Sequence, residues 1–278
     1  RQRQMCIRDR LYRLAENGTA PKLTVNAQSK HNGVAKTFNI IGEIKGKEKP
    51  NEYIILSAHF DSWDGAQGAT DNGTGTITMM ETIRTIKKLY PNNKRTILIC
   101  LWGSEEQGLN GSRAFVEDHP EIIKNIQAVF NQDNGTGRVV NINGSGFEKS
   151  YEYMTRWLQA VPNFITKEIK TDFPGMPSGG GSDHASFIAA GAPAFGLSSL
   201  NWGYGTYTWH TNKDTYDKIV FEEVQTNAIL SATLTMMADQ EKDLVSRERR
   251  VLPTGRDGKQ QEWPEVKSPA RNSDTYLK

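Results

Sequence analysis

Short apolar runs alternate with longer amphipathic runs along the middle of the chain. Four short runs are rich in apolar or β-branched residues and end in polar or glycine-rich turns, which predicts strands over residues 52–60, 95–103, 127–133 and 193–199. The longer runs predict helices over about 74–90, 148–160 and 221–242. Residues 25–46 alternate like an antiparallel strand pair at a sheet edge. Strands that alternate with helices in this way predict an α/β sheet protein.

The composition divides the chain into three parts. Residues 1–20 are polar and unpatterned, and because their opening RQRQMCIRDR resembles translated adaptor sequence, we treat them as an N-terminal extension that is partly non-native. Residues 21–243 carry the predicted elements and form one domain of catalytic size. Charge and proline dominate residues 244–278, which predicts a polar flexible tail.

Charge, cysteine content and hydropathy exclude several classes of protein. The 278 residues carry a formal net charge of +2, and no long basic block interleaves with aromatic residues, so we expect no nucleic-acid partner. Two cysteines, Cys6 and Cys100, cannot build a disulfide framework or a four-thiolate zinc site, and Cys100 lies in an apolar run that places it in the core. No stretch approaches the ~20 apolar residues of a membrane span, and residues 1–20 lack the apolar centre of a signal peptide.

Charged side chains gather where the predicted strands end. The first strand runs into SAHFDSWDGAQGATDNGTG (57–75), the second into GSEEQG and the third into NQD, and a later loop reads YTWHTNKDT. In open α/β sheets the carboxyl ends of the strands border the crevice in which ligands bind, so we expect these side chains to converge. They are His59, Asp61, Asp71, Glu105, Glu106, Asp133 and His210.

Five of these side chains form a metal-binding composition of two histidines and three carboxylates. Taken alone, a His-x-Asp pair is commonly a surface or capping pair and a Glu-Glu doublet a solvated face, but together at strand ends they would be costly to bury without an ion. Imidazole with carboxylate favours zinc over calcium or magnesium. Two ions about 3.5–4 Å apart that share a carboxylate explain the surplus of acids, and one glutamate of the doublet can then move a proton. The five are His59, Asp71, Glu106, Asp133 and His210.

Five motifs resemble, in order and spacing, the co-catalytic di-zinc aminopeptidase family, which also includes glutamate carboxypeptidases and glutaminyl cyclases. They are HFDSWDGAQGATDNGTG, LWGSEEQGLNGS, NQDNGTG, SDHASF and WHTNKDT, and the match covers about residues 25–239. The first motif looks most like the plasma glutamate carboxypeptidase (carboxypeptidase Q) branch, whose members act largely as dipeptidases. The resemblance implies a three-layer α/β/α sandwich with a mixed, mostly parallel central sheet.

The resemblance also implies a role for each residue of the set and a cofactor of two zinc ions per chain. Asp71 becomes the bridging ligand, Glu106 and His210 complete one zinc, and His59 and Asp133 complete the other. Glu105 becomes the general base, and Asp61 orients His59, as metal-bound imidazoles usually require. The family also tends to have a cis peptide bond after the bridging aspartate, here between Asp71 and Asn72.

Two further groups of residues are candidates for substrate binding. The motif SGGGSDHASF places Asp183 and His184 at a helix start, where Ser182 or Asp183 can serve as an N-cap, and the resemblance places His184 near the rim of the active site. The glycine-rich stretch NWGYGTYTW before His210 is a candidate pocket wall, and it contributes Trp202, Tyr204, Tyr207 and Trp209.

These observations predict a zinc-dependent exopeptidase that cleaves next to a free N-terminus, as an aminopeptidase or dipeptidase acting on a peptide or dipeptide substrate. A serine hydrolase is disfavoured because the chain lacks Gly-x-Ser-x-Gly, and dinucleotide binding because GTGTIT lacks the third glycine. Two alternatives stay open on the same fold, a glutaminyl cyclase-like acyltransferase and a non-catalytic binding ectodomain. As relatives in this branch do, we expect the full-length protein to be exported (periplasmic or extracellular), and a homodimer stays open.

Overall fold

The computed structural model describes residues 2–30, 33, 35–255 and 258–271. Contacts divide the chain into an N-terminal unit that ends at Ala35 and a domain that begins at Lys36. The N-terminal unit contains helix α1 (Gln2–Glu16), within the region that we had treated as an unpatterned extension. In this helix the Tyr12 hydroxyl donates a hydrogen bond to the Glu16 carboxylate at 2.7 Å, a pair at the helical spacing of four residues.

The domain is built on one seven-stranded sheet in the order β1-β3-β2-β4-β7-β5-β6. The strands are β1 (Ile40–Ile44), β2 (Lys49–His59), β3 (Arg95–Trp102), β4 (Ile126–Asn131), β5 (Val139–Asn143), β6 (Lys170–Asp172) and β7 (Ala194–Ser199). Pairing is parallel at β2–β3, β2–β4, β4–β7 and β5–β6, and antiparallel at β1–β3 and β5–β7. The expected α/β class with a mixed, mostly parallel sheet is therefore confirmed.

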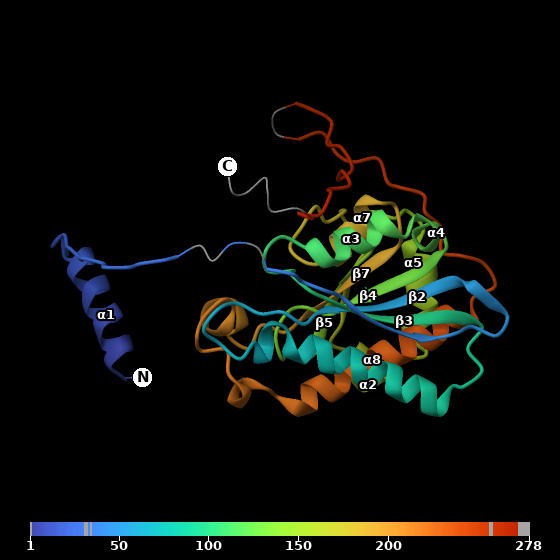
Figure 1. Ribbon diagram of the computed structural model, residues 1–278, viewed down its shortest axis with the longest axis horizontal. Coiled ribbons are helices and arrows are strands. Elements are labelled where there is room, and N and C mark those ends of the chain that lie inside the picture. The colour runs from blue at the N-terminus through green and yellow to red at the C-terminus, as the bar shows by residue number, and fades with distance from the viewer. Residues whose placement is uncertain (1, 31–32, 34, 256–257, 272–278) are drawn as a thin grey trace. The chain divides into compact units, whose positions relative to one another are not determined.

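Helices cover both faces of the sheet (Figure 1). Helices α2 (Thr74–Leu89), α5 (Ser150–Gln159) and α8 (Phe221–Gln240) share one hydrophobic cluster with the strands. Helices α3 (Asn110–Asp118), α4 (Pro120–Ile123) and α7 (His184–Ala189) share the other, and the short helix α6 (Asn163–Thr166) follows α5. The three remaining short turns are η1 (Ala69–Gly73), η2 (Tyr204–Thr208) and η3 (Tyr216–Lys218).

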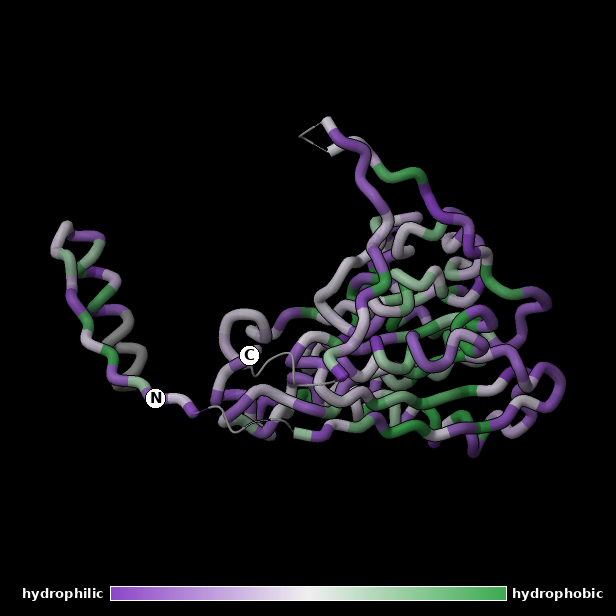
Figure 2. The backbone as a smooth tube through the Cα atoms, turned by 45° about the horizontal axis from the view of Figure 1, so that its top comes forward, coloured by the Kyte–Doolittle hydropathy of each residue, from purple (hydrophilic) through white to green (hydrophobic). Residues whose placement is uncertain are grey.

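Alternation along the central strands explains this three-layer arrangement. In β2, Ile54 and Leu56 point into the α2/α5/α8 cluster and Ile55 into the other, because successive side chains of a strand face opposite sides. A strand buried on both faces reads as a continuous apolar run, which is how β2 and β3 were found in the sequence. Cys100 of β3 is buried in the α3/α7 cluster, as expected. Figure 2 shows the hydrophobic stretches in the interior of the domain and hydrophilic residues along its outer loops.

The sheet differs from the prediction at its two edges. The expected strand pair over 25–46 is a single strand, β1; no other strand occurs among the residues of that range that the structure describes. Val25 and Phe38 are exposed there, so the alternating pattern does not correspond to a buried strand face. At the other edge, β5 and β6 were not predicted, since they are short and all three residues of β6 are exposed.

Parts of the C-terminal segment, residues 241–255 and 258–271, contact the domain, within the region where we expected a flexible tail from residue 244. Val245 and Leu252 are buried, and the Arg247 guanidinium donates hydrogen bonds to the carbonyls of Ile123, Ile126 and Gly191 at 2.9–3.2 Å. The Trp263 ring packs on Phe147 with the ring centroids 5.4 Å apart. These anchors are isolated and polar residues separate them, so no apolar period marks them in the sequence. Residues 272–278 of the expected tail lie outside the described residues.

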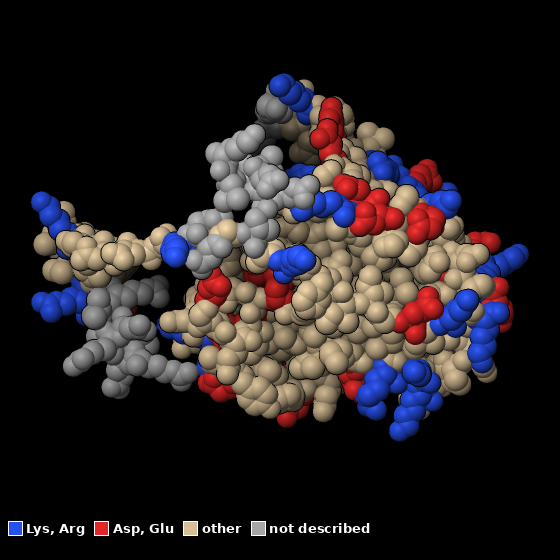
Figure 3. All heavy atoms as spheres, viewed as in Figure 1, with Lys and Arg blue, Asp and Glu red and all other residues tan. Residues whose placement is uncertain are grey.

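On the face shown in Figure 3, Lys and Arg side chains are interspersed with Asp and Glu side chains around the domain. Among the described residues, no helix is long and apolar enough to cross a membrane.

Candidate metal centre

The carboxyl ends of three neighbouring parallel strands meet at one edge of the sheet. His59 is the last residue of β2 and pairs in register with Trp102 of β3, and Ser57 pairs with Asn131 of β4. Glu105 and Glu106 follow β3, and Asp133 follows β4, so the register alone brings these side chains close to His59. The charged residues at the strand ends therefore lie close together, as predicted.

Two groups of donor atoms form there and share one residue. The first consists of His59, Asp71 and Asp133, and the second of Asp71, Glu106 and His210, with the donor atoms of each group within 4.8 Å of one another. The His59 Nε2 atom lies 3.2 Å from Asp133 Oδ1 and 3.3 Å from Asp71 Oδ1. The His210 Nε2 atom lies 2.8 Å from Glu106 Oε2 and 3.6 Å from Asp71 Oδ2. Asp71 thus turns one carboxylate oxygen toward each histidine.

The buried carboxylates of this cluster make it a suitable site for cations. Asp71 and Asp133 are buried, and the Asp71 Oδ2 and Glu106 Oε1 atoms have no hydrogen-bond partner among the described residues. Burial, followed by the charge of Asp71, raises the pKa of Glu106 to about 7. Burial alone would lower the pKa of His59, but Asp133, Asp61 and Asp71 hold it well above its ordinary value. Unpaired buried acids are costly, and two ions held by the two groups would compensate them.

Glu105 lies at the edge of the centre rather than within either donor group. Its Oε2 atom is 4.0 Å from His59 Nε2, and its side chain lines the same cavity as the donors. Burial, with the charges of Asp133, Asp183 and Glu106, raises the pKa of Glu105 to about 9 against the opposing effect of His59.

Asp61 contacts both His59 and the Glu105–Glu106 turn. The His59 Nδ1 atom lies 3.1 Å from the backbone carbonyl of Asp61 and 3.5 Å from its carboxylate. The two carboxylate oxygens accept hydrogen bonds from the backbone N–H groups of Glu105 and Glu106 at 3.1 and 3.2 Å. Asp61 therefore fixes the imidazole mainly through its backbone, and its carboxylate fixes the turn that carries both glutamates.

Asp214 holds the shared aspartate in place, and the sequence reasoning missed it. Its carboxylate is buried and accepts hydrogen bonds from Thr70 N and Thr70 Oγ1, both at 2.7 Å, and from Asp71 N at 2.8 Å. The peptide bond that follows Asp71 is cis, as the resemblance implied. Asp214 lies inside the quoted motif WHTNKDT, so its place beside His210 was the available signal.

Aromatic rings enclose His210 from two sides. The Trp209 ring stacks on the imidazole at a centroid distance of 4.2 Å, and Trp63, another residue missed in the sequence, stacks on it at 4.5 Å and 6°. Tyr204 and Trp209 line the main cavity, as expected of a pocket wall. Tyr207 instead lines a smaller neighbouring pocket of about 70 Å³ together with Trp202. Of the aromatic stretch, only part faces the metal centre.

His184 lines a second cavity beside the metal centre. The main cavity has a volume of about 490 Å³, and the second, of about 260 Å³, shares Asp133 and the loop at Gly180 with it. Burial lowers the pKa of His184 to about 4. Asp183, one of the two expected N-cap residues, occupies the N-cap position of α7, but its side chain makes no capping hydrogen bond.

The sequence of this chain is similar to sequences of peptidases. Carboxypeptidase Q from Xenopus laevis is 32% identical over 208 residues, which cover 74% of this chain and 42% of that protein. The chain thus spans less than half the length of the carboxypeptidase Q sequences from Xenopus laevis, Pongo abelii and Homo sapiens that it matches.

Solved structures and a family model agree with this placement. A peptidase M28 precursor from Shewanella amazonensis has a TM-score of 0.65 and 27% identity, covering 77% of this chain and 46% of that chain. A zinc aminopeptidase from Bacillus subtilis has a TM-score of 0.57 and 26% identity, covering 70% of this chain and 48% of that chain. The model of peptidase family M28 matches residues 39–235, which contain both donor groups. The chain belongs to peptidase family M28.

Proposed function

We propose that this chain is a two-zinc exopeptidase that hydrolyses the peptide bond next to a free N-terminus, as an aminopeptidase or dipeptidase. The observation that carries the proposal is the shared carboxylate of Asp71, which faces His59 with one oxygen and His210 with the other. A carboxylate shared by two donor groups is what a pair of ions 3.5–4 Å apart requires. The zinc aminopeptidase among the structural relatives supports the choice of metal.

Each donor group would hold one ion, His59, Asp71 and Asp133 the first, and Asp71, Glu106 and His210 the second. When bound, two zinc ions supply Lewis acidity toward the scissile carbonyl and acidify a water molecule.

Glu105 would take a proton from the attacking water and return it to the leaving amine. It lies beside the centre and lines the same cavity as the donor groups, so its carboxylate can face a water molecule held there. Asp61 would hold Glu105 at this distance, because its carboxylate accepts the backbone N–H groups of the turn. The proposed roles thus divide into one proton-transferring side chain and one positioning side chain.

The charge of the cavity supports recognition of a free amine. Glu105, Glu106, Asp71 and Asp133 line it, and a cationic α-amino group can pair with the negative charge that two bound ions leave over. Tyr204 and Trp209 would form the wall that limits how much chain fits before the scissile bond. His184 would face the substrate from the second cavity.

A comparison of two dipeptides tests the proposal. The zinc-loaded protein should release free amino acids from Ala-Leu, and a chelator should abolish the release. N-acetyl-Ala-Leu at the same concentration should be cleaved far more slowly, since it lacks the cationic amine. Equal cleavage of both peptides would argue against amine recognition and in favour of a carboxypeptidase or endopeptidase reaction at the same centre.

A further inference from the structure

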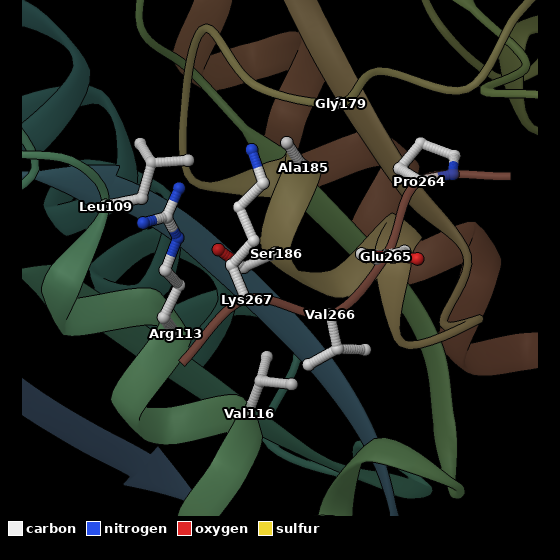
Figure 4. A pocket seen from close by; sticks show the side chains of 11 residues that line it. Leu109, Arg113, Val116, Gly179, Ala185, Ser186, Pro264, Glu265, Val266 and Lys267 are labelled. Carbon is white, nitrogen blue, oxygen red and sulfur yellow. The ribbon is translucent and has the colours of Figure 1, made fainter. Parts of the chain in front are cut away.

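Two positive side chains border the acidic cavity. Arg113 of α3 and Lys267 of the C-terminal segment line the same 490 Å³ space as Glu105 and Asp133. Across residues 36–255 and 258–271, neither charged group has a hydrogen-bond or ion-pair partner. Figure 4 shows the two side chains extending in the same direction from their different elements, Arg113 from the helix and Lys267 from the segment that crosses it. Two free cations therefore lie at the rim of a site whose centre is anionic.

The fold holds Lys267 at this rim from both sides. Upstream, the Trp263 indole N–H donates a hydrogen bond to the Ile188 carbonyl at 2.9 Å. Downstream, the Ala270 N–H donates to Asn110 Oδ1 at 2.8 Å, and Arg271 forms an ion pair with Asp118 at 2.7 Å. The segment thus crosses from α7 to α3 between fixed points.

Apolar side chains of the segment and of the helices line one small cavity between these points, and the first turn of α3 positions Arg113. Val266 and Pro264 lie with Val116, Ala185 and Ala189 around a small cavity under the segment (Figure 4). Arg113 N donates a hydrogen bond to the Leu109 carbonyl at 3.0 Å, so Arg113 lies one turn after the loop that carries Glu105 and Glu106.

We propose that Arg113 and Lys267 form a carboxylate-binding subsite for the residue that follows the scissile bond, an inference that rests on the proposed function. The guanidinium fork matches a carboxylate with two parallel hydrogen bonds, and the lysine ammonium adds a point charge. Glu105 lines the same cavity, so a substrate attacked beside Glu105 can reach both cations. A carboxylate bound there would pair with both cations, which have no other partner among the described residues.

The size of the cavity favours a short peptide as the source of that carboxylate. Two extended residues span about 7 Å, and pockets for small ligands occupy about 300–1,000 Å³, a range that includes the 490 Å³ found here. A dipeptide zwitterion would place its amine at the acidic centre and its α-carboxylate at the cationic rim. An acidic side chain on the second residue has the same chemistry and is the alternative source.

A binding experiment tests the subsite without depending on turnover. Zinc-loaded Glu105→Gln protein is titrated calorimetrically with Ala-Leu and with Ala-Leu-amide. We expect the acid to bind about 10- to 100-fold more tightly, the range of a charge-assisted hydrogen bond. Adding Arg113→Gln and Lys267→Met should reduce this preference to less than about 3-fold, whereas Lys124→Met, which removes an exposed lysine outside the cavity, should preserve it. Thermal melts check that each variant is folded.

Two further peptides identify the source of the carboxylate. A preference for Ala-Glu-amide over Ala-Gln-amide would assign the subsite to an acidic side chain, and a preference confined to Ala-Leu over its amide would assign it to the α-carboxylate. Equal affinity within both pairs, or a preference that survives removal of both cations, would overturn the subsite. If the wild-type protein cleaves none of these peptides while the binding preference holds, the proposed function fails and the subsite stands.

Discussion

Asp214→Asn should weaken both the fold and the metal centre, although Asp214 is not a predicted ligand. The carboxylate accepts three hydrogen bonds, from Thr70 N, Thr70 Oγ1 and Asp71 N. An asparagine keeps one acceptor oxygen, so its NH₂ group must face at least one of these buried donors. A hydrogen bond to a charged group contributes about 1.5–3 kcal/mol, and an unsatisfied buried donor costs a similar amount. We therefore expect the free energy of unfolding to fall by about 2–4 kcal/mol.

The same substitution should loosen the shared aspartate. Asp71 N is one of the three donors, so its carboxylate loses the anchor that aims one oxygen at each histidine. Outer partners of metal ligands typically contribute about 10- to 100-fold in affinity, and we expect zinc affinity to drop by this factor.

Urea unfolding of the metal-free protein, followed by circular dichroism, measures the first effect, and zinc titration against a competing chelator measures the second. Asp243→Asn, the same change at an exposed position after α8, is the matched control and should alter neither quantity. Lost stability with unchanged zinc affinity would show that Asp214 holds the loop without aligning Asp71. If neither quantity moved, the reasoning from its three hydrogen bonds would be refuted.

Three other predictions concern proton transfer, pH and the C-terminal segment. Glu105→Gln should lower kcat on Ala-Leu by about 10²–10⁴-fold while elemental analysis still finds two zinc ions per chain; near-normal turnover would contradict its role. In metal-free protein the pKa values of Glu105 and Glu106 are raised from 4.5 to about 9 and about 7, so the native state binds protons that the unfolded chain has released. Its stability should therefore fall as pH rises from about 5 to 9, and melting temperatures of chelated and zinc-loaded protein should diverge over this range; parallel curves would contradict the assignment. Trp263→Ala removes the packing on Phe147 and the hydrogen bond to Ile188, and should cost about 2–4 kcal/mol of unfolding free energy in urea; an unchanged value would mean that the segment is not anchored there.

The sequence predicts best those parts of the fold whose residues are apolar because both faces of the element are buried. Strands β2 and β3 are covered on both faces, so they read as continuous apolar runs, and the charged residues directly after them stand out. Strand β6 is exposed, and its three polar residues carry no such signal. Trp63 was missed because nothing in its neighbourhood distinguishes a ring that stacks on a distant histidine from any other exposed tryptophan.

Positioning residues are harder to find because they act through the backbone. Two of the three groups that donate to Asp214 are backbone N–H groups, and only the Thr70 hydroxyl depends on residue type, so little in the sequence around Thr70 marks these contacts. Arg247 likewise donates to the backbone carbonyls of Ile123 and Ile126. Such contacts depend on where the chain passes, and that is known only once the sheet has been assembled.

The donor atoms of the metal centre come from loops that follow different strands and lie far apart along the chain. His59 is the last residue of β2, and His210 follows β7, with most of the domain between them in sequence. A cation held jointly by these loops would act as a cross-link that closes very long loops of the unfolded chain, and loop-closure entropy grows with loop length. Metal binding would therefore tie together the whole sheet rather than one turn, and a fragment that ends before β7 would lose the shared arrangement even if its own strands formed.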